Sequence, residues 1–297
     1  MIHKAKKSMG QNFLKSQEAL RKMCEAGEVN DKDIILEIGP GKGALTEKLL
    51  EKAGRVIAVE KDRELFEFLK EKFINEIKSR KLILLNDDIL KINLNEVFFK
   101  FSSDPRMRED EEPDHSENLK TPRLDFDFDY KIIANIPYNI TGAILKKFLS
   151  CDNQPERIVL LVQKEVAERI VVRDSKESIL SLSVKAYGTP KYVMKVHKRF
   201  FTPEPKVDSA IIAITNISKD NFKTDMDEKN FFNIIKAGFA HKRKILRRNL
   251  ENLQTLEVRL PKIDEIFEKL GINPKARAED IKLETWLKIS RSLSTDI

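Results

Sequence analysis

The stretch Ile34-Ile35-Leu36-Glu37-Ile38-Gly39-Pro40-Gly41-Lys42-Gly43 predicts the fold of this chain. Its first five residues are mostly apolar, which is typical of a buried strand, and the glycines that follow end the strand at once. Glycine allows the main chain to approach a ligand closely. Leu45, Leu49 and Leu50 then recur at helical spacing. The stretch therefore predicts a strand, a ligand-binding turn and a helix in succession.

The same alternation continues downstream of this stretch. Residues 55–60 and 82–85 read as further apolar strands, with a helical pattern between them. Strands that alternate with helices are typical of a parallel, doubly wound α/β sheet. Glu60 ends the second strand, where a carboxylate can accept hydrogen bonds from a ribose diol. Asp88 follows the third strand and can accept one from an adenine amino group, so the pattern predicts a site for an adenosyl cofactor.

The glycine turn by itself leaves a second cofactor class open. Gly39, Gly41 and Ala44 also satisfy a loose dinucleotide fingerprint, with Glu60 at a plausible distance, so a nicotinamide-dependent dehydrogenase is an alternative. The additional glycine at position 43 and the long segment that precedes the first strand both weigh against that alternative.

A second informative stretch is Asn135-Ile136-Pro137-Tyr138, which follows an apolar run at 132–134. Ligands bind at the carboxyl ends of strands in open α/β sheets. The Asn135 side-chain oxygen and a backbone carbonyl beside Pro137 can both accept hydrogen bonds from one amino group. Tyr138 can stack on the base that carries this group, and Phe201 is a candidate for its opposite face. The alternatives are an ordinary Pro-Tyr turn and simple core packing of Phe201.

Charge is distributed unevenly along the 297 residues, whose net charge is +7. The proline-containing segment 102–129 holds ten acids and four bases, which predicts an exposed insertion of net charge −6. The rest of the chain therefore carries +13, which suits a polyanion such as nucleic acid. Beyond about residue 216 the pattern is helical only. Its basic residues are predicted to contact RNA phosphates; they are Lys242, Arg243, Lys244, Arg247 and Arg248.

Several classes of protein are disfavoured by composition. The two cysteines form no CxxC pair and the four histidines lack ligand spacing, so we expect neither a disulfide framework nor a metal site. No apolar run approaches the length of a membrane span, and we expect a cytoplasmic protein. A Pro-Cys dipeptide, which cytosine carbon methylation would need for a covalent step, is absent.

Taken in order, the motifs resemble those of the small-subunit ribosomal RNA adenine N6,N6-dimethyltransferase family. The resemblance runs nearly end to end, but the insertion 102–129 lies outside it. The matching pieces are Gly10-Gln11-Asn12-Phe13-Leu14, Glu37 to Thr46, Glu60, Asp88, Asn135 to Tyr138, Gln163 to Ala167, Phe201 to Ser209 and Arg243-Lys244-Ile245-Leu246.

The resemblance implies a Rossmann-like methyltransferase domain over residues 1–216 and a small helical RNA-binding domain over 217–297. It implies S-adenosylmethionine as cofactor and, as substrate, adenosines near the 3′ end of small-subunit rRNA within an immature subunit, bound by a monomer. The implied cofactor-binding residues are Asn12, Leu14, Gly39, Gly41, Glu60, Asp88, Ile89 and Asn135. The residues implied to hold the target base are Asn135, Pro137, Tyr138 and Phe201.

Two other functions remain open at this point. One is that of the related large-subunit rRNA adenine N6-methyltransferases that confer macrolide resistance, which share the cofactor loop and a similar Asn-x-Pro-Tyr element. The tail, with Arg243-Lys244-Ile245-Leu246 and a helical end, favours the small-subunit group. The other is an RNA-binding ribosome-assembly factor without a need for catalysis, which intact cofactor residues disfavour as a sole role.

Overall fold

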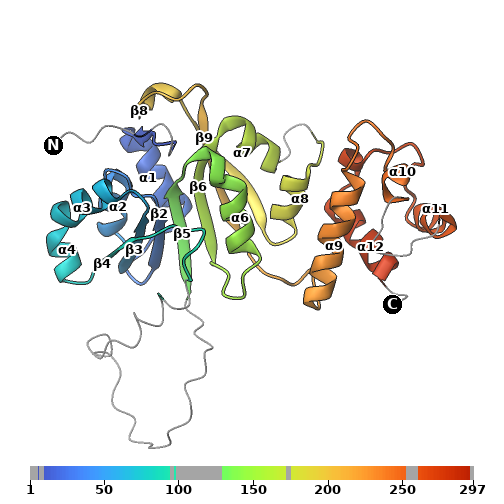
Figure 1. Cartoon of the computed structure of the whole chain (residues 1–297), viewed down its shortest axis with the longest axis horizontal. Coiled ribbons are helices and arrows are strands. Elements are labelled where there is room, and N and C mark those ends of the chain that lie inside the picture. Colours follow the sequence, from blue (N-terminus) through green and yellow to red (C-terminus); the bar gives the residue numbers. More distant parts are fainter. Residues whose placement is uncertain are drawn as a thin grey trace, which may run out of the picture.

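A mixed sheet of seven strands organises the amino-terminal two thirds of the chain (Figure 1). The computed structural model describes residues 6, 10–93, 97, 129–171, 175–251 and 260–294. The acidic insertion predicted over 102–129 therefore lies outside the described residues, except for Asp129. In their order across the sheet, the strands are β4 (Leu82–Asn86), β3 (Arg55–Glu60), β2 (Ile34–Ile38), β5 (Tyr130–Asn135), β6 (Arg157–Gln163), β9 (Ser209–Thr215) and β7 (Thr189–Val196).

Among the strands of this sheet, β9 alone runs opposite to the others. The strands from β4 to β6 run parallel, whereas β9 pairs antiparallel with both β6 and β7. The chain builds outward from β2 through β3 to β4 and then returns to place β5 on the other side of β2. This reversal of strand order leaves a crevice at the carboxyl ends of β2 and β5, which is where doubly wound sheets bind ligands. The α/β fold expected from the sequence is confirmed.

Helices cover both faces of the sheet because successive strand residues point to opposite sides. On β5, Ile133 packs in one core cluster, whereas Ile132 and Ala134 pack in the other. The first face carries α1 (Gln17–Ala26), α2 (Ala44–Leu50) and, toward the β4 edge, α3 (Arg63–Lys72) and α4 (Ile74–Lys78). The second face carries α6 (Thr141–Leu149), α7 (Lys164–Val171) and α8 (Ile179–Lys185).

Past β9 the described chain is helical. Its helices are α9 (Asp225–Gly238), α10 (Leu246–Leu250), α11 (Leu260–Lys269) and α12 (Leu283–Ser294). Trp286 is fully buried and stacks on Phe239 at 5.9 Å between ring centroids. Gly238 permits this packing, because a Cβ there would lie 2.3 Å from the indole ring. The apolar cluster of the second sheet face continues into α9, so a domain boundary at residue 216 stays a prediction.

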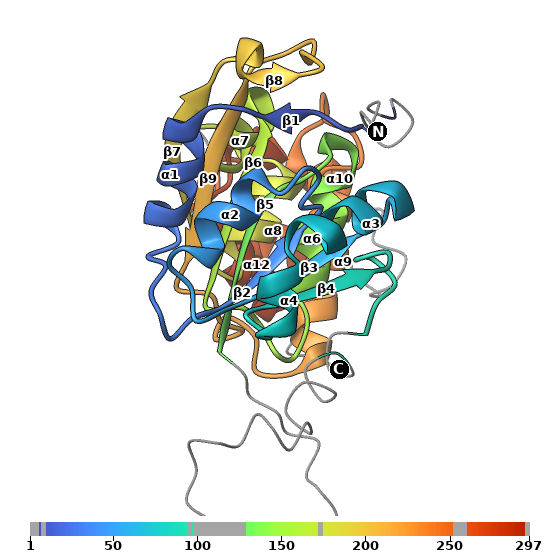
Figure 2. The same ribbon diagram turned by 90° about the vertical axis from the view of Figure 1, so that its left-hand side faces the viewer.

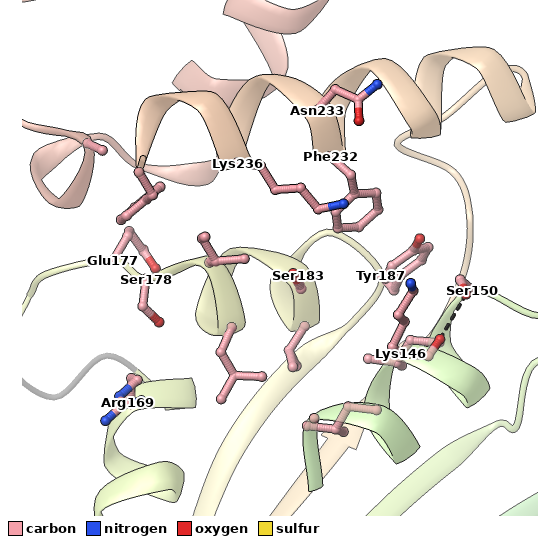
Figure 3. A pocket seen from close by; sticks show the side chains of 18 of the residues that line it. Lys146, Ser150, Arg169, Glu177, Ser178, Ser183, Tyr187, Phe232, Asn233 and Lys236 are labelled. Atoms are coloured by element: carbon pink, nitrogen blue, oxygen red, sulfur yellow. Dashed lines mark hydrogen bonds between the residues drawn. The ribbon is translucent and has the colours of Figure 1, made fainter. Parts of the chain in front are cut away.

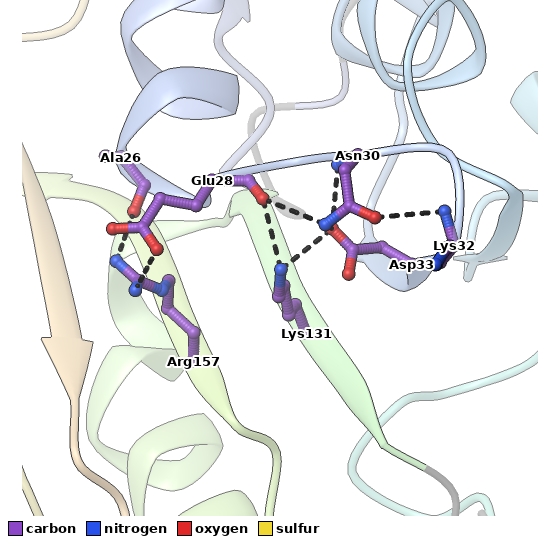
Figure 4. A network of polar contacts seen from close by, with 7 residues as sticks. All are labelled: Ala26, Glu28, Asn30, Lys32, Asp33, Lys131 and Arg157. Carbon is purple, nitrogen blue, oxygen red and sulfur yellow. Dashed lines mark hydrogen bonds and ion pairs between the residues drawn. The ribbon is translucent and has the colours of Figure 1, made fainter.

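A polar network closes the amino-terminal edge of the sheet (Figure 4). Lys131 of β5 is only 8% exposed and donates to the Asp33 carboxylate at 2.8 Å and to the Glu28 carbonyl at 3.1 Å. Arg157 of β6 pairs with the Glu28 carboxylate at 2.7 Å and donates to the Ala26 carbonyl at 3.0 Å. These contacts fasten the connection between α1 and β2 to the two central strands, at the end of the sheet opposite the crevice.

Candidate functional site

The glycine turn after β2 forms the floor of the crevice. Gly39, Gly41 and Gly43 all have positive φ angles, between 60° and 79°, which only glycine adopts without strain. A Cβ at Gly43 would lie 2.6 Å from the Phe73 ring, so this glycine lets α2 pack closely against α3. Nothing lies within 4 Å of the corresponding position at Gly39. Open space therefore adjoins the main chain where the turn begins.

Glu60 ends β3 beside this turn and is 6% exposed. One oxygen accepts from the Gly41 N–H at 3.0 Å and the other from the Asp62 N–H at 2.8 Å. Burial raises the pKa of Glu60, and the two backbone donors act against that rise. Each oxygen keeps a second lone pair, so the carboxylate can still accept from two further hydroxyl groups.

Asp88 follows β4 on the same side of the crevice. Its carboxylate accepts from the Lys61 ammonium and from the Leu90 N–H, both at 3.0 Å. Burial acts to raise the pKa of Asp88, but the hydrogen bonds from Lys61 and Leu90 outweigh it and lower the pKa overall. The next residue, Ile89, is 5% exposed and packs in the sheet core. An ionised acceptor and an apolar wall thus stand side by side.

The Asn135 side chain projects from the carboxyl end of β5. Its Nδ2 donates to the Asn12 carbonyl at 3.2 Å, which fixes the amide so that Oδ1 remains available as an acceptor. The chain then turns through Pro137 into a short 3-10 helix, η3 (Tyr138–Ile140). The Ile140 N–H donates to the Pro137 carbonyl at 3.2 Å, and α6 begins at Thr141.

Tyr138 opens η3 and is partly buried. Its hydroxyl shares a hydrogen bond of 2.7 Å with the hydroxyl of Ser209, the first residue of β9. Burial raises the pKa of Tyr138, and the bond to Ser209 partly offsets that rise. The ring is therefore held between the end of β5 and the start of β9.

An amino-terminal segment lies across the same end of the sheet. Strand β1 (Phe13–Leu14) pairs antiparallel with β8 (Phe201–Thr202), as Figure 2 shows. Lys6 and Gln11 both donate to the Asp62 carboxylate, at 2.9 and 2.8 Å. Burial opposes the effect of these donors, but they lower the pKa of Asp62 to about 2. The segment before α1 is thus tied to the N-cap of α3, two residues after Glu60.

These elements enclose a cavity of about 930 Å³. The structure brings together around it every predicted cofactor residue and three of the four residues predicted to hold the base. They are Asn12, Leu14, Gly39, Gly41, Glu60, Asp88, Ile89, Asn135, Pro137 and Tyr138.

Phe201 is the exception among the predicted site residues. It is 3% exposed, pairs with Leu14 across the β1–β8 ladder and packs in the core cluster of the first sheet face. The next residue, Thr202, lines the cavity in its place. In this conformation Phe201 is a core residue, which was the alternative interpretation of it, because neighbouring side chains already cover its ring.

Glu37 lines the cavity but was not among the predicted site residues. Glu37 is 1% exposed, and its Oε2 has no hydrogen-bond partner among the described residues. Burial raises the pKa of Glu37 to about 8; the Thr46 hydroxyl acts against this rise and the Glu60 charge adds to it. The sequence feature that could have identified Glu37 is its position inside the apolar strand 34–38, since carboxylates are rarely buried without a partner.

The predicted RNA-binding residues do not form one free cationic surface. Arg247 forms a bidentate pair with Asp264, at 2.5 and 2.7 Å, and also contacts Glu251 at 2.8 Å. Lys242, Arg243 and Lys244 are exposed in the connection between α9 and α10, and Arg248 is exposed on α10. Arg247 is therefore already satisfied within the helical region, because one guanidinium serves two carboxylates.

A second cavity, of about 910 Å³, lies between α8 and α9 (Figure 3). Lys242 lines it together with Lys146 of α6 and Lys236 of α9, and no carboxylate partner is recorded for these three among the described residues. The acids Glu177 and Glu279 in the lining are paired internally, with Lys185 and Lys176 respectively. The groove therefore carries excess positive charge.

Two negative findings apply to the part of the chain that the structure describes. No group of three or more histidine, cysteine, aspartate or glutamate side chains there could hold a metal ion. No helix among the described residues is both long and apolar enough to cross a membrane.

Comparison with known proteins gives matches along nearly the whole chain. A family model described as "Ribosomal RNA adenine dimethylase" matches residues 2–295. A Dehalococcoides mccartyi (strain CBDB1) protein named ribosomal RNA small subunit methyltransferase A is 39% identical over 286 residues, 96% of this chain and 87% of the relative.

Solved structures match over the same extent. A dimethyladenosine transferase from Plasmodium falciparum has a TM-score of 0.71 at 25% identity, over 93% of this chain and 95% of its own. The 23S rRNA methyltransferase ErmE has a TM-score of 0.68 at 22% identity, over 96% of this chain and 100% of its own. The second likeness shows a shared fold alone.

Proposed function

Because the chain belongs to the ribosomal RNA adenine dimethylase family, we propose that it transfers methyl groups to the exocyclic amino group of adenosines near the 3′ end of small-subunit rRNA. As a member of that family it is an rRNA adenine dimethyltransferase. The observation that carries the finer proposal is the convergence of Asn135 and Tyr138 with Glu60 and Asp88 on one cavity. The cavity thus offers base-binding and cofactor-binding groups side by side.

S-adenosylmethionine is the methyl donor that this family implies, and the cavity has features that suit it. Glu60 offers two free lone pairs for the ribose hydroxyls, and Asp88 offers a carboxylate for the adenine amino group. Gly39 leaves open space next to the main chain, where part of the cofactor can lie. When bound, the cofactor supplies an electrophilic methyl group on a sulfonium.

The residues around the target base act by orientation. The Asn12 carbonyl holds the Asn135 amide so that its Oδ1 accepts from the adenine amino group. This hydrogen bond favours a pyramidal nitrogen, whose lone pair is otherwise delocalised into the ring. The Tyr138 ring stacks on the target adenine after this base has flipped out of the RNA base stack. Alignment of this kind can lower a barrier by about 7–11 kcal/mol, so the mechanism requires no catalytic histidine or lysine.

RNA outside the cavity is held by charge. We assign the chemistry to residues 1–216 and phosphate contacts to the helical region 217–297, where Lys236 and Lys242 face the second cavity. Phosphate contacts of this kind position an RNA without reading its sequence. We further propose that the enzyme acts as a monomer, in the cytoplasm, on an immature small subunit.

Mass mapping of rRNA tests the proposal. Immature small subunits and large subunits are incubated separately with the protein and isotopically labelled S-adenosylmethionine, and the RNA is then digested and its adenosines mapped. We expect N6,N6-dimethyladenosine near the 3′ end of the small-subunit rRNA. Label in the large-subunit RNA alone would favour the macrolide-resistance activity, and binding without label would favour an assembly factor.

A further inference from the structure

A buried serine at the start of β9 contacts the tyrosine that we propose to bind the base. Ser209 is fully buried and begins β9. It pairs with Gln163 of β6 on one side and with Val196 of β7 on the other, so its backbone is held by two ladders. A side chain on such a backbone has little freedom to move.

The segment that leads into Ser209 is also fixed. The Asp208 carbonyl accepts from the Lys164 N–H at 3.0 Å, and the Asp208 carboxylate accepts from the Lys198 N–H at 3.0 Å. The same carboxylate forms an ion pair with Lys195 at 2.9 Å. The hydroxyl of Ser209 is therefore presented from a rigid frame, and it lies 2.7 Å from the hydroxyl of Tyr138.

Tyr138 is held much less firmly by its own element. It lies in the three-residue helix η3, where its carbonyl accepts from the Thr141 hydroxyl at 3.1 Å. No other hydrogen bond of its side chain is recorded within the described chain. The ring orientation therefore depends on the contact that its hydroxyl makes with Ser209.

We propose that Ser209 is a positioning residue, which holds the Tyr138 ring in the plane that receives the target adenine. This inference rests on the proposed function, in which the Tyr138 ring stacks on the base. It adds that the tyrosine hydroxyl contributes to the reaction through Ser209, although stacking itself requires only the ring. Asn135 and Tyr138 are then each held by a residue remote in sequence, Asn12 and Ser209 respectively.

A double-mutant cycle tests this coupling. Ser209→Ala and Tyr138→Phe each remove one end of the same hydrogen bond, so each should lower the single-turnover methylation rate by about 2- to 10-fold, the effect of one neutral hydrogen bond. The double variant should be no slower than either single variant, because the bond is lost only once. The affinity for S-adenosylmethionine should stay unchanged in all three.

Fluorine NMR provides a readout that does not depend on activity. Incorporation of 3-fluorotyrosine labels the 4 tyrosines of the chain, and the Tyr138→Phe variant identifies the resonance of Tyr138. Ser209→Ala should shift or broaden that resonance and leave the other three in place. Ser181→Ala is the matched control, because Ser181 on α8 is equally buried and loses a bond of 2.8 Å to Glu177. It should change neither the Tyr138 resonance nor the rate.

The outcomes distinguish failure of the positioning role of Ser209 from failure of the proposed function. An unmoved Tyr138 resonance in Ser209→Ala, or a double variant whose loss equals the product of the single losses, overturns the positioning role. Should Ser209→Ala not fold, Tyr138→Phe decides alone, and a wild-type rate in that variant overturns the role as well. A shifted resonance in a protein that never methylates small-subunit RNA leaves the contact intact and removes the proposed function.

Discussion

Glu60→Gln removes a charge from the centre of the proposed cofactor site with almost no change in shape. Both oxygens of Glu60 already accept from backbone N–H groups, those of Gly41 and Asp62. The amide nitrogen of glutamine would face one of these donors and could accept nothing from the ribose. Hydrogen bonds to charged groups contribute about 1.5–3 kcal/mol of binding free energy, and a bond that is only weakened accounts for a smaller loss. We expect S-adenosylmethionine affinity to fall by about 1–3 kcal/mol, or roughly 5- to 150-fold.

Isothermal titration calorimetry measures this loss directly, and thermal unfolding shows whether the variant is folded. Glu51→Gln is a suitable control, since Glu51 is an exposed carboxylate at the end of α2 that pairs with Lys48 at 2.6 Å and does not line the cavity. It should bind the cofactor as the wild type does. Unchanged affinity in a folded Glu60→Gln protein would remove Glu60 from the site, and tighter binding of NADH than of S-adenosylmethionine would overturn the enzyme class.

Three other perturbations test separate parts of the account. Asn135→Ala should slow single-turnover methylation by about 10²-fold, the effect of losing one oriented hydrogen-bond partner, and leave RNA affinity from filter binding nearly unchanged; a wild-type rate would return this element to an ordinary turn. Replacing Lys236 and Lys242 by glutamine should reduce the slope of log affinity against log salt by roughly 1–2 units, whereas Lys52→Gln, in the turn between α2 and β3, should not. Burial raises the pKa of Glu37 from 4.5 to about 8. Between these two pH values the folded protein keeps the Glu37 proton, whereas the unfolded chain has lost it. The free energy of unfolding should therefore fall as pH rises through that range. Urea unfolding between pH 5 and 8 should show a decline of about 1.4 kcal/mol per pH unit from this group, absent in Glu37→Gln; parallel curves would contradict the burial argument.

The amino-acid sequence alone predicted the class of fold and most of the site residues that line the cavity. The apolar runs at 34–38, 55–60 and 132–134 specify buried strands, and the glycines after residue 38 allow only a tight turn. In a parallel sheet the carboxyl ends of neighbouring strands meet at one edge. The residues that end these strands, Glu60 and Asn135 among them, therefore had to lie close together.

The short β1–β8 ladder could not be predicted in this way. Each of its strands has two residues, which is too short for a recognisable alternation. Their pairing joins residues 13 and 202, and it depends on a sheet that is already assembled. The same pairing buries Phe201 and puts Thr202 against the cavity, so the expected stacking ring lies in the core in this conformation.

The sequence determines which strands form and which polar groups end them, because these are local consequences of apolar periodicity and of glycine and proline geometry. Tertiary structure decides which of those groups remain available to a ligand. The pairing of Arg247 with Asp264 and the bond from Tyr138 to Ser209 each join segments that the chain brings together only after folding. Burial, likewise, is a property of the assembled core, and it raises the pKa of Glu37 by removing water from a carboxyl group that the sequence shows only as one acid in an apolar strand.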